Sequence, residues 1–138
     1  MANEITVQAK LTAAKNGASI TNATSSKTQT MESTLEKLHH TVQEVGTSSE
    51  AVSLGDVDVS KQHWILLRNL DATNFVTVHI RKDVTPTDTV AGVMLPGESF
   101  GPVRAGAQTA GYPHYRTTAD TAACPVEVGA CDAGNPAA

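Results

Sequence analysis

The sequence predicts an all-β protein, an antiparallel β-sandwich of a jelly-roll-like kind. Short segments rich in β-forming residues recur at regular spacing, and turn-prone residues separate them. The composition agrees, because 40% of the residues are hydrophobic but only 4% are aromatic, so Val, Ile, Leu and Ala must build a thin core. From residue 51 onward the predicted strands are Ala51–Leu54, His63–Asn69, Phe75–Arg81, Val90–Leu95, Phe100–Arg104, Tyr115–Thr118 and Val126–Gly129.

The chain has the size of one domain. Its 138 residues are enough for one hydrophobic core. We predict a single β-sandwich domain over residues 1–131, followed by a flexible tail at residues 132–138, where Gly134 and Pro136 lie among small residues.

An arm-like hairpin is predicted for about residues 1–31. In Glu4–Ala13 every second residue from Ile5 is apolar, which indicates a strand with one dry face. Asn16-Gly17 follows and is a strong hairpin signal, because both residues tolerate positive φ. The return strand, Ser19–Met31, is rich in Ser and Thr, which favours an edge or a surface arm.

Residues 31–45 allow two interpretations. Apolar residues recur there at helical spacing, and Ser33 with Glu36 fits a helix capping box. The stretch His40–Val45 is nevertheless rich in β-forming residues. We therefore predict a strand at Leu38–Val45, with room for a short helical turn near residues 32–38.

One motif suggests catalysis. Gly97-Glu98-Ser99-Phe100-Gly101 matches the G-x-S-x-G pattern, in which a serine nucleophile lies between a strand and a helix. The residues after Ser99 do not begin a helix readily, and no Asp or Glu lies between Ser99 and His114. We therefore interpret Pro96-Gly97 as the turn of a β-hairpin and predict no catalytic residue.

No cofactor or metal site is predicted. No C-x-x-C pair is present, and Asp56 and Asp58 lack the further oxygen ligands of a calcium loop, so a turn before a strand explains them. Metal-ligand spacing is also missing among the histidines, which are His39, His40, His63, His79 and His114.

Nucleic acid and membranes are not expected as partners. The net charge is −4, whereas nucleic-acid binding depends on clustered Lys and Arg. The longest strongly apolar run, Trp64–Leu67, is far shorter than the roughly 20 residues of a membrane-spanning helix. Because Glu4 lies in an N-terminus without an apolar signal-peptide segment, we expect synthesis in the cytosol.

Two alternatives describe Cys124 and Cys131. A hairpin would bring their Cα atoms within the roughly 5.5–6 Å of a disulfide. Alternatively, both are thiols in a protein that folds under reducing conditions.

Aromatic residues give one further alternative. Trp64 lies in an apolar strand and is expected in the core. Tyr112-Pro113-His114-Tyr115 is the one predicted surface aromatic cluster, and it supports a carbohydrate- or receptor-binding β module as an alternative function.

Several motifs resemble small structural proteins of tailed bacteriophages. The segment HWILLRNLDATNFVTVHI contains a strand of the form "apolar run, Arg or Lys, N-L-D-x-T-N" that turns directly into a second strand, and we expect Asp71 and Asn74 to close a hairpin there. The opening MANEITVQAKLTAAKNGASI, the phrase GTSSEAVSLGDV, a Leu-Pro-Gly-Glu hairpin and the later RTTADTAACPVEVGA occur in the corresponding order. The likeness touches most of the chain.

This resemblance implies a non-enzymatic virion protein. The first expectation is a capsid decoration (cement) protein, made in the host cytoplasm, that bridges subunits of the major capsid protein and assembles with copies of itself as a homotrimer. The alternative is a tail, neck or baseplate component. Both readings assign no catalytic residue and no cofactor.

Overall fold

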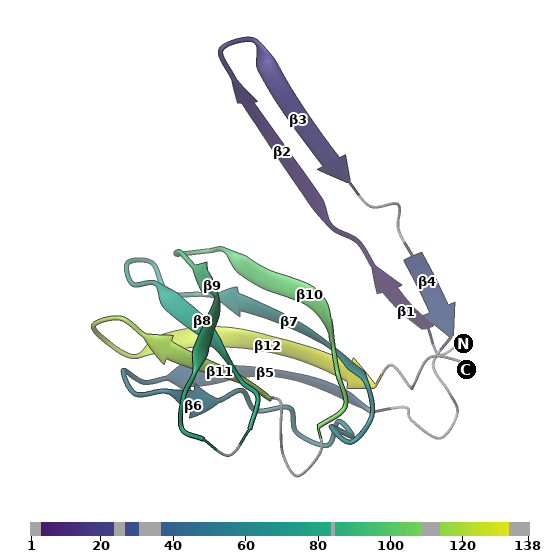
Figure 1. Cartoon of the computed structure of the whole chain (residues 1–138), viewed down its shortest axis with the longest axis vertical. Coiled ribbons are helices and arrows are strands. Elements are labelled where there is room, and N and C mark those ends of the chain that lie inside the picture. The colour runs from purple at the N-terminus through teal and green to yellow at the C-terminus, as the bar shows by residue number, and fades with distance from the viewer. Residues whose placement is uncertain (1–3, 24–26, 31–36, 84, 109–113, 133–138) are drawn as a thin grey trace.

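The computed structural model of the chain describes residues 4–23, 27–30, 37–83, 85–108 and 114–132. These residues form two four-stranded antiparallel sheets that face each other, together with an N-terminal arm (Figure 1). The all-β sandwich predicted from the sequence is therefore confirmed, while its jelly-roll-like character stays a prediction. Within the described ranges, no helix is long and apolar enough to span a bilayer.

The strands divide between a first sheet and a second sheet. The order in the first sheet is β10 (Ser99–Ala105), β7 (His63–Asn69), β12 (Cys124–Asp132) and β5 (Leu38–Val45). The order in the second sheet is β6 (Glu50–Ala51), β11 (His114–Ala119), β8 (Val76–Arg81) and β9 (Thr89–Met94).

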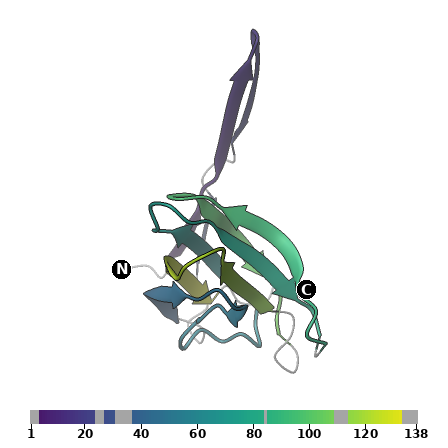
Figure 2. The ribbon, with the colours of Figure 1, turned by 90° about the vertical axis from the view of Figure 1, so that its left-hand side faces the viewer.

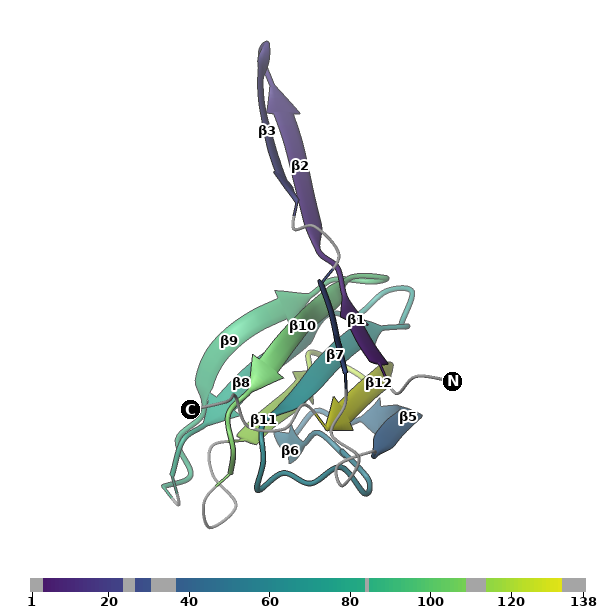
Figure 3. The same cartoon turned by 90° about the vertical axis from the view of Figure 1, so that its right-hand side faces the viewer.

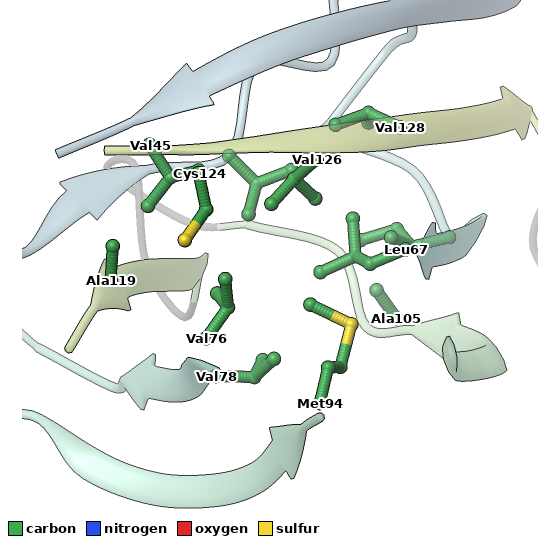
Figure 4. Close-up of a cluster of buried hydrophobic side chains, with 12 residues drawn as sticks. Val45, Leu67, Val76, Val78, Met94, Ala105, Ala119, Cys124, Val126 and Val128 are labelled. Carbon is green, nitrogen blue, oxygen red and sulfur yellow. The ribbon is translucent and has the colours of Figure 1, made fainter. Parts of the chain in front are cut away.

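Strict alternation of side chains builds the core between the sheets. Along β12 every second residue from Cys124 is buried, and β7 buries every second residue from His63. Val is the most frequent buried residue, and Ile65, Leu67 and Met94 are the largest buried aliphatic side chains. Figure 4 shows Leu67 and Met94 among the valines. The core is thin because period-two burial gives each strand only a few inward positions.

Two predicted hairpins connect the sheets instead of lying within one. Strand β7 pairs with β10 and β12, whereas β8 pairs with β9 and β11. The D-x-T-N motif therefore carries the chain from the first sheet to the second, and the hairpin prediction for it was wrong. The Leu-Pro-Gly-Glu segment likewise joins β9 of the second sheet to β10 of the first. At both points the chain passes from one sheet to the other, and the strands on either side of each connection bury one face in the core between the sheets.

Asn69 at the end of β7 holds both connections. Its side chain is fully buried; Nδ2 donates to the carbonyls of Asn74 at 2.9 Å and Met94 at 3.1 Å. Its Oδ1 accepts from the backbone N–H of Asp71 at 3.0 Å. The predicted role of Asp71 is confirmed, since its carboxylate accepts from the N–H groups of Thr73 and Asn74, and these bonds lower its pKa.

The arm consists of two strand pairs in line. Strand β1 (Glu4–Val7) pairs with β4 (Lys27–Thr30), and farther out β2 (Lys10–Lys15) pairs with β3 (Ala18–Ala23). The predicted turn at Asn16-Gly17 is confirmed, with φ values of 51° and 81°. The strand predicted at Glu4–Ala13 is split, and its dry face is limited to the base. Figures 1 and 2 show β2 and β3 extending away from the sandwich.

Strand β5 begins at Leu38 and ends at Val45, as predicted. Residues 31–36, which contain most of the expected helical turn, lie outside the described residues. The same applies to residues 133–138 of the predicted tail.

Candidate binding surfaces

The G-x-S-x-G segment forms a turn and a strand. The N–H of Glu98 donates to the carbonyl of Leu95 at 2.9 Å, and Gly97 has a φ of 80°, which together define a type II β-turn with Pro96 at its first corner. Ser99 then begins β10 in the first sheet, whereas His114 begins β11 in the second. A nucleophile elbow requires a helix after the serine, so this segment lacks that geometry.

The histidines are dispersed through the fold. The ring of His40 lies 3.1 Å from the Glu127 carboxylate on the outer side of the first sheet, while His63 is buried with Nδ1 3.0 Å from the Lys61 carbonyl. His79 lies on β8, and His114 lies at the start of β11. Within the part of the chain that the structure describes, no three His, Cys, Asp or Glu side chains are grouped to hold a metal ion.

Asp58 lies in the turn predicted before β7. Its carboxylate accepts from the backbone N–H and the hydroxyl of Ser60, and these bonds hold its pKa below the usual value. The backbone N–H of Lys61 closes the turn by donating to the Asp58 carbonyl.

Cys124 and Cys131 lie on the same strand. Strand β12 runs without a turn from Cys124 to Asp132, so the seven-residue separation places their Cα atoms about 23 Å apart. Cys124 faces the core, whereas Cys131 is half-buried on the outer side. Both thiols are free, and burial is the main reason that the pKa of each is raised. The hairpin needed for the disulfide alternative is not formed.

The aromatic residues occupy different positions from those predicted. Trp64 was expected in the core, but it lies on the outer side of β7, where the Arg104 guanidinium is 5.0 Å from the centre of its ring. Tyr115 packs inward against Phe100, with ring centres 5.7 Å apart, and burial raises its pKa. Tyr112 and Pro113 lie outside the described residues. A surface aromatic platform would therefore have to form without Tyr115.

An apolar groove lies between the base of the arm and the outer side of the first sheet. Figure 3 shows β1 crossing this side of the sheet near β7 and β12. The groove has a volume of about 540 Å³, and its lining includes Ile5, Leu38, Trp64, Leu66, Pro102 and Cys131. Among the described residues, Trp64 Nε1 is buried without a hydrogen-bond partner. Apolar side chains that line an open groove suit a surface that a protein partner covers.

The outer part of the arm presents a second apolar surface. All residues of β2 and β3 are exposed. The register pairs Ala13 with Ile20, Leu11 with Asn22 and Lys15 with Ala18, all on the same side of the ribbon. We call the four apolar residues of this side, Leu11, Ala13, Ala18 and Ile20, the arm face. Leu11 is 60% exposed and Ile20 is 58% exposed.

A charged cluster lies on the second sheet. The Asp88 carboxylate accepts from Arg81 Nε and from the hydroxyl of Ser49, both at 2.6 Å, and Arg116 Nε lies 3.8 Å away. Arg116 also donates to the hydroxyl and carbonyl of Ser49. These bonds lower the pKa of Asp88. Because the two guanidinium groups share the Asp88 carboxylate and Arg116 also binds Ser49, the cluster fastens the β6 region to β11 and to the β8–β9 loop.

No protein-family model matches this sequence, and comparisons with curated proteins and with solved structures likewise gave no match.

Sequence reasoning missed the groove although the information was present. The alternation that buries Ile65 and Leu67 necessarily turns Trp64 and Leu66 to the other side of β7. What the sequence did not indicate is that β1 crosses this side and forms one wall of the groove.

Proposed function

We propose that the chain is a non-enzymatic structural protein of a tailed-bacteriophage virion, acting as a capsid decoration (cement) protein. The observation that carries the proposal is the arm. Its strands β2 and β3 are exposed along their whole length and extend about 20 Å at the usual rise per residue. A protein that joins neighbouring subunits needs such a surface beyond its own core.

The two apolar surfaces support the same role. The arm face and the groove leave large aliphatic side chains in water, and contiguous apolar surfaces of this kind mark sites of protein association. The motifs resembling phage structural proteins give the setting, which is the virion, after synthesis in the host cytoplasm. The partners are then the major capsid protein and further copies of this chain, in a trimer.

The proposed mechanism is bridging. A subunit that contacts two capsid subunits adds interactions that must all break before the shell can open. Each contact needs to contribute only modestly, because many copies act together on one particle.

Heat resistance of particles tests this mechanism. Particles that lack the chain are expected to release DNA at a lower temperature than wild-type particles, measured as DNA accessible to a nuclease. Adding back the purified full chain should restore the resistance, whereas an equal amount of an unrelated β-sandwich protein should not. Equal DNA release with and without the chain would contradict the proposal.

A tail, neck or baseplate component remains the second candidate, because an exposed arm also suits docking to a ring. This role predicts only a few copies of the chain per particle and no effect on the heat resistance of the head.

A further inference from the structure

We propose that the arm face of one copy docks in the apolar groove of a second copy. The inference deepens the proposed function by naming the contact between copies, and it rests on that function for its biological setting. The contact itself is argued from the arm, the groove and the distribution of charge.

The outer arm lacks the packing that normally stabilises a hairpin. Every side chain of β2 and β3 is exposed, and an isolated two-stranded hairpin is at best marginally stable in water. The Asn16-Gly17 turn fixes the register of the strands, but a turn alone supplies no buried surface. A partner that covers one side of the ribbon would supply it.

The two sides of the ribbon differ in the way that such a partner requires. The side of the arm face holds both large aliphatic residues, Leu11 and Ile20, with Lys15 and Asn22 at its two ends. The opposite side holds only small or polar residues, which are Lys10, Thr12, Ala14, Ser19, Thr21 and Ala23. Large aliphatic side chains on one side only are typical of a sheet that packs on one face and meets water on the other. The arm face is therefore the side expected to be covered.

The overall charge of the two parts favours a second copy as the occupant, although the described lining of the groove itself contains no Asp or Glu. From Glu4 to Thr30, the range of strands β1 to β4, the sequence has three Lys residues and one acid, Glu4, a net charge of +2. Residues 37–132 have seven Lys and Arg against eleven Asp and Glu, a net charge of −4. A cationic arm is attracted to an acidic body of this kind, and every copy supplies both parts.

The groove has the chemistry that matches the arm face. It is lined mainly by apolar side chains, and its volume of about 540 Å³ is in the range of pockets that hold several aliphatic groups. Within the described residues, β1 lines the groove but Leu11 and Ile20 do not. The groove of each copy thus remains open to the arm of another. Because the arm and the groove are different surfaces, each copy docks head to tail on the next. Repeated docking gives a closed ring when the rotation between neighbouring copies brings the last copy back to the first.

The first test compares two neighbouring positions on β3 in the isolated full-length chain. The mass of the wild-type chain in solution, measured by analytical ultracentrifugation, should be at least twice the 14.4 kDa of one chain. Ile20→Asp places a charge on the arm face and should raise the dissociation constant by at least about 10-fold, as expected for a buried aliphatic contact. Thr21→Asp makes the same charge change on the opposite side and should leave the constant within about 3-fold of wild type.

The second test makes the same comparison on the sandwich. Leu66→Asp alters the groove, whereas Val93→Asp alters an exposed position on the edge strand of the second sheet; the two side chains are 42% and 50% exposed. Only Leu66→Asp should weaken association. Unchanged thermal unfolding of both variants at a concentration where they are monomeric would show that each sandwich is intact.

Three results would overturn the inference. The first is a wild-type chain that stays monomeric at about 100 µM, a concentration above the dissociation constant expected for a specific contact. The second is an equal effect of Ile20→Asp and Thr21→Asp on the dissociation constant. The third is dissociation by Val93→Asp but not by Leu66→Asp. These outcomes concern the contact between copies alone. Absence of the chain from virions would instead overturn the proposed function.

Discussion

Replacing Asn69 by Leu tests whether one buried amide joins the two connections between the sheets. Leu has the same branched arrangement of side-chain heavy atoms and is larger than Asn, so the substitution removes the polar contacts without opening a cavity. It leaves the carbonyls of Asn74 and Met94 without their donor, and it leaves the Asp71 N–H without its acceptor. The β7–β8 and β9–β10 connections then lose their common anchor.

The expected cost follows from the hydrogen bonds that are lost. A typical intramolecular hydrogen bond contributes about 0.5–1.5 kcal/mol net, and an unsatisfied buried group costs more. For the three bonds of Asn69 we expect a loss of about 3 kcal/mol, a large share of the usual stability of about 5–15 kcal/mol. For a domain of this size, the corresponding fall in Tm is about 10 °C.

Urea unfolding, followed by Trp64 fluorescence at fixed protein concentration, measures this loss. The control is Arg68→Leu, which introduces the same residue at the next position of β7, where the side chain is exposed; it should change the free energy of unfolding by less than about 0.5 kcal/mol. If Asn69→Leu were as stable as the Arg68→Leu control, the assigned role of Asn69 would be wrong.

Three further predictions concern a glycine, an ion pair and the thiols. Gly101 has a φ of 99°, and a Cβ there would lie 2.7 Å from the Ile65 carbonyl oxygen, so Gly101→Ala should reduce the free energy of unfolding by about 1–3 kcal/mol. Gly106 has open space around it, so Gly106→Ala should not reduce the free energy of unfolding. Equal unfolding curves for the two variants would refute this. The hydrogen bonds from Arg81 and Ser49 hold the pKa of Asp88 in the folded protein below its ordinary value. The pairing therefore stabilises the fold above the ordinary pKa of an Asp, and this stabilisation is lost as the pH falls through the lower pKa of the folded state. Asp88→Asn should remove this part of the acid dependence, and an unchanged acid-unfolding profile would count against it. The intact mass of the non-reduced monomer should equal that of the chain with both thiols free, and the mass of an internally bridged chain would contradict the geometry of β12. The half-buried Cys131 should react with a thiol reagent before the buried Cys124.

Much of the fold could be predicted from local patterns. Strands β5 and β7 match their predicted bounds because Leu38–Val45 and His63–Asn69 are rich in β-forming residues. The Asn16-Gly17 and Pro96-Gly97 turns were predictable because each needs positive φ at a glycine. These features depend on residues that are close in the sequence.

The pairing of strands could not be predicted in the same way. A tight turn after β9 reads as a hairpin, but whether β10 continues in the same sheet or crosses the core depends on which distant strand it pairs with. Strand β12 shows the same limit, because Cys124 and Cys131 could end a hairpin or lie on one strand until its pairing with both β5 and β7 is known.

The candidate surfaces were predictable only in part. An exposed N-terminal arm follows from the few apolar residues between Ser19 and Thr30. The groove does not, because Trp64 and Leu66 become part of a groove only where β1 crosses them.

The number of copies in the particle tests the central claim most directly. Quantitative mass spectrometry of purified virions should find this chain at a copy number comparable to that of the major capsid protein. A handful of copies per particle would instead assign it to the tail, neck or baseplate, and its absence from virions would contradict the account of a structural virion protein.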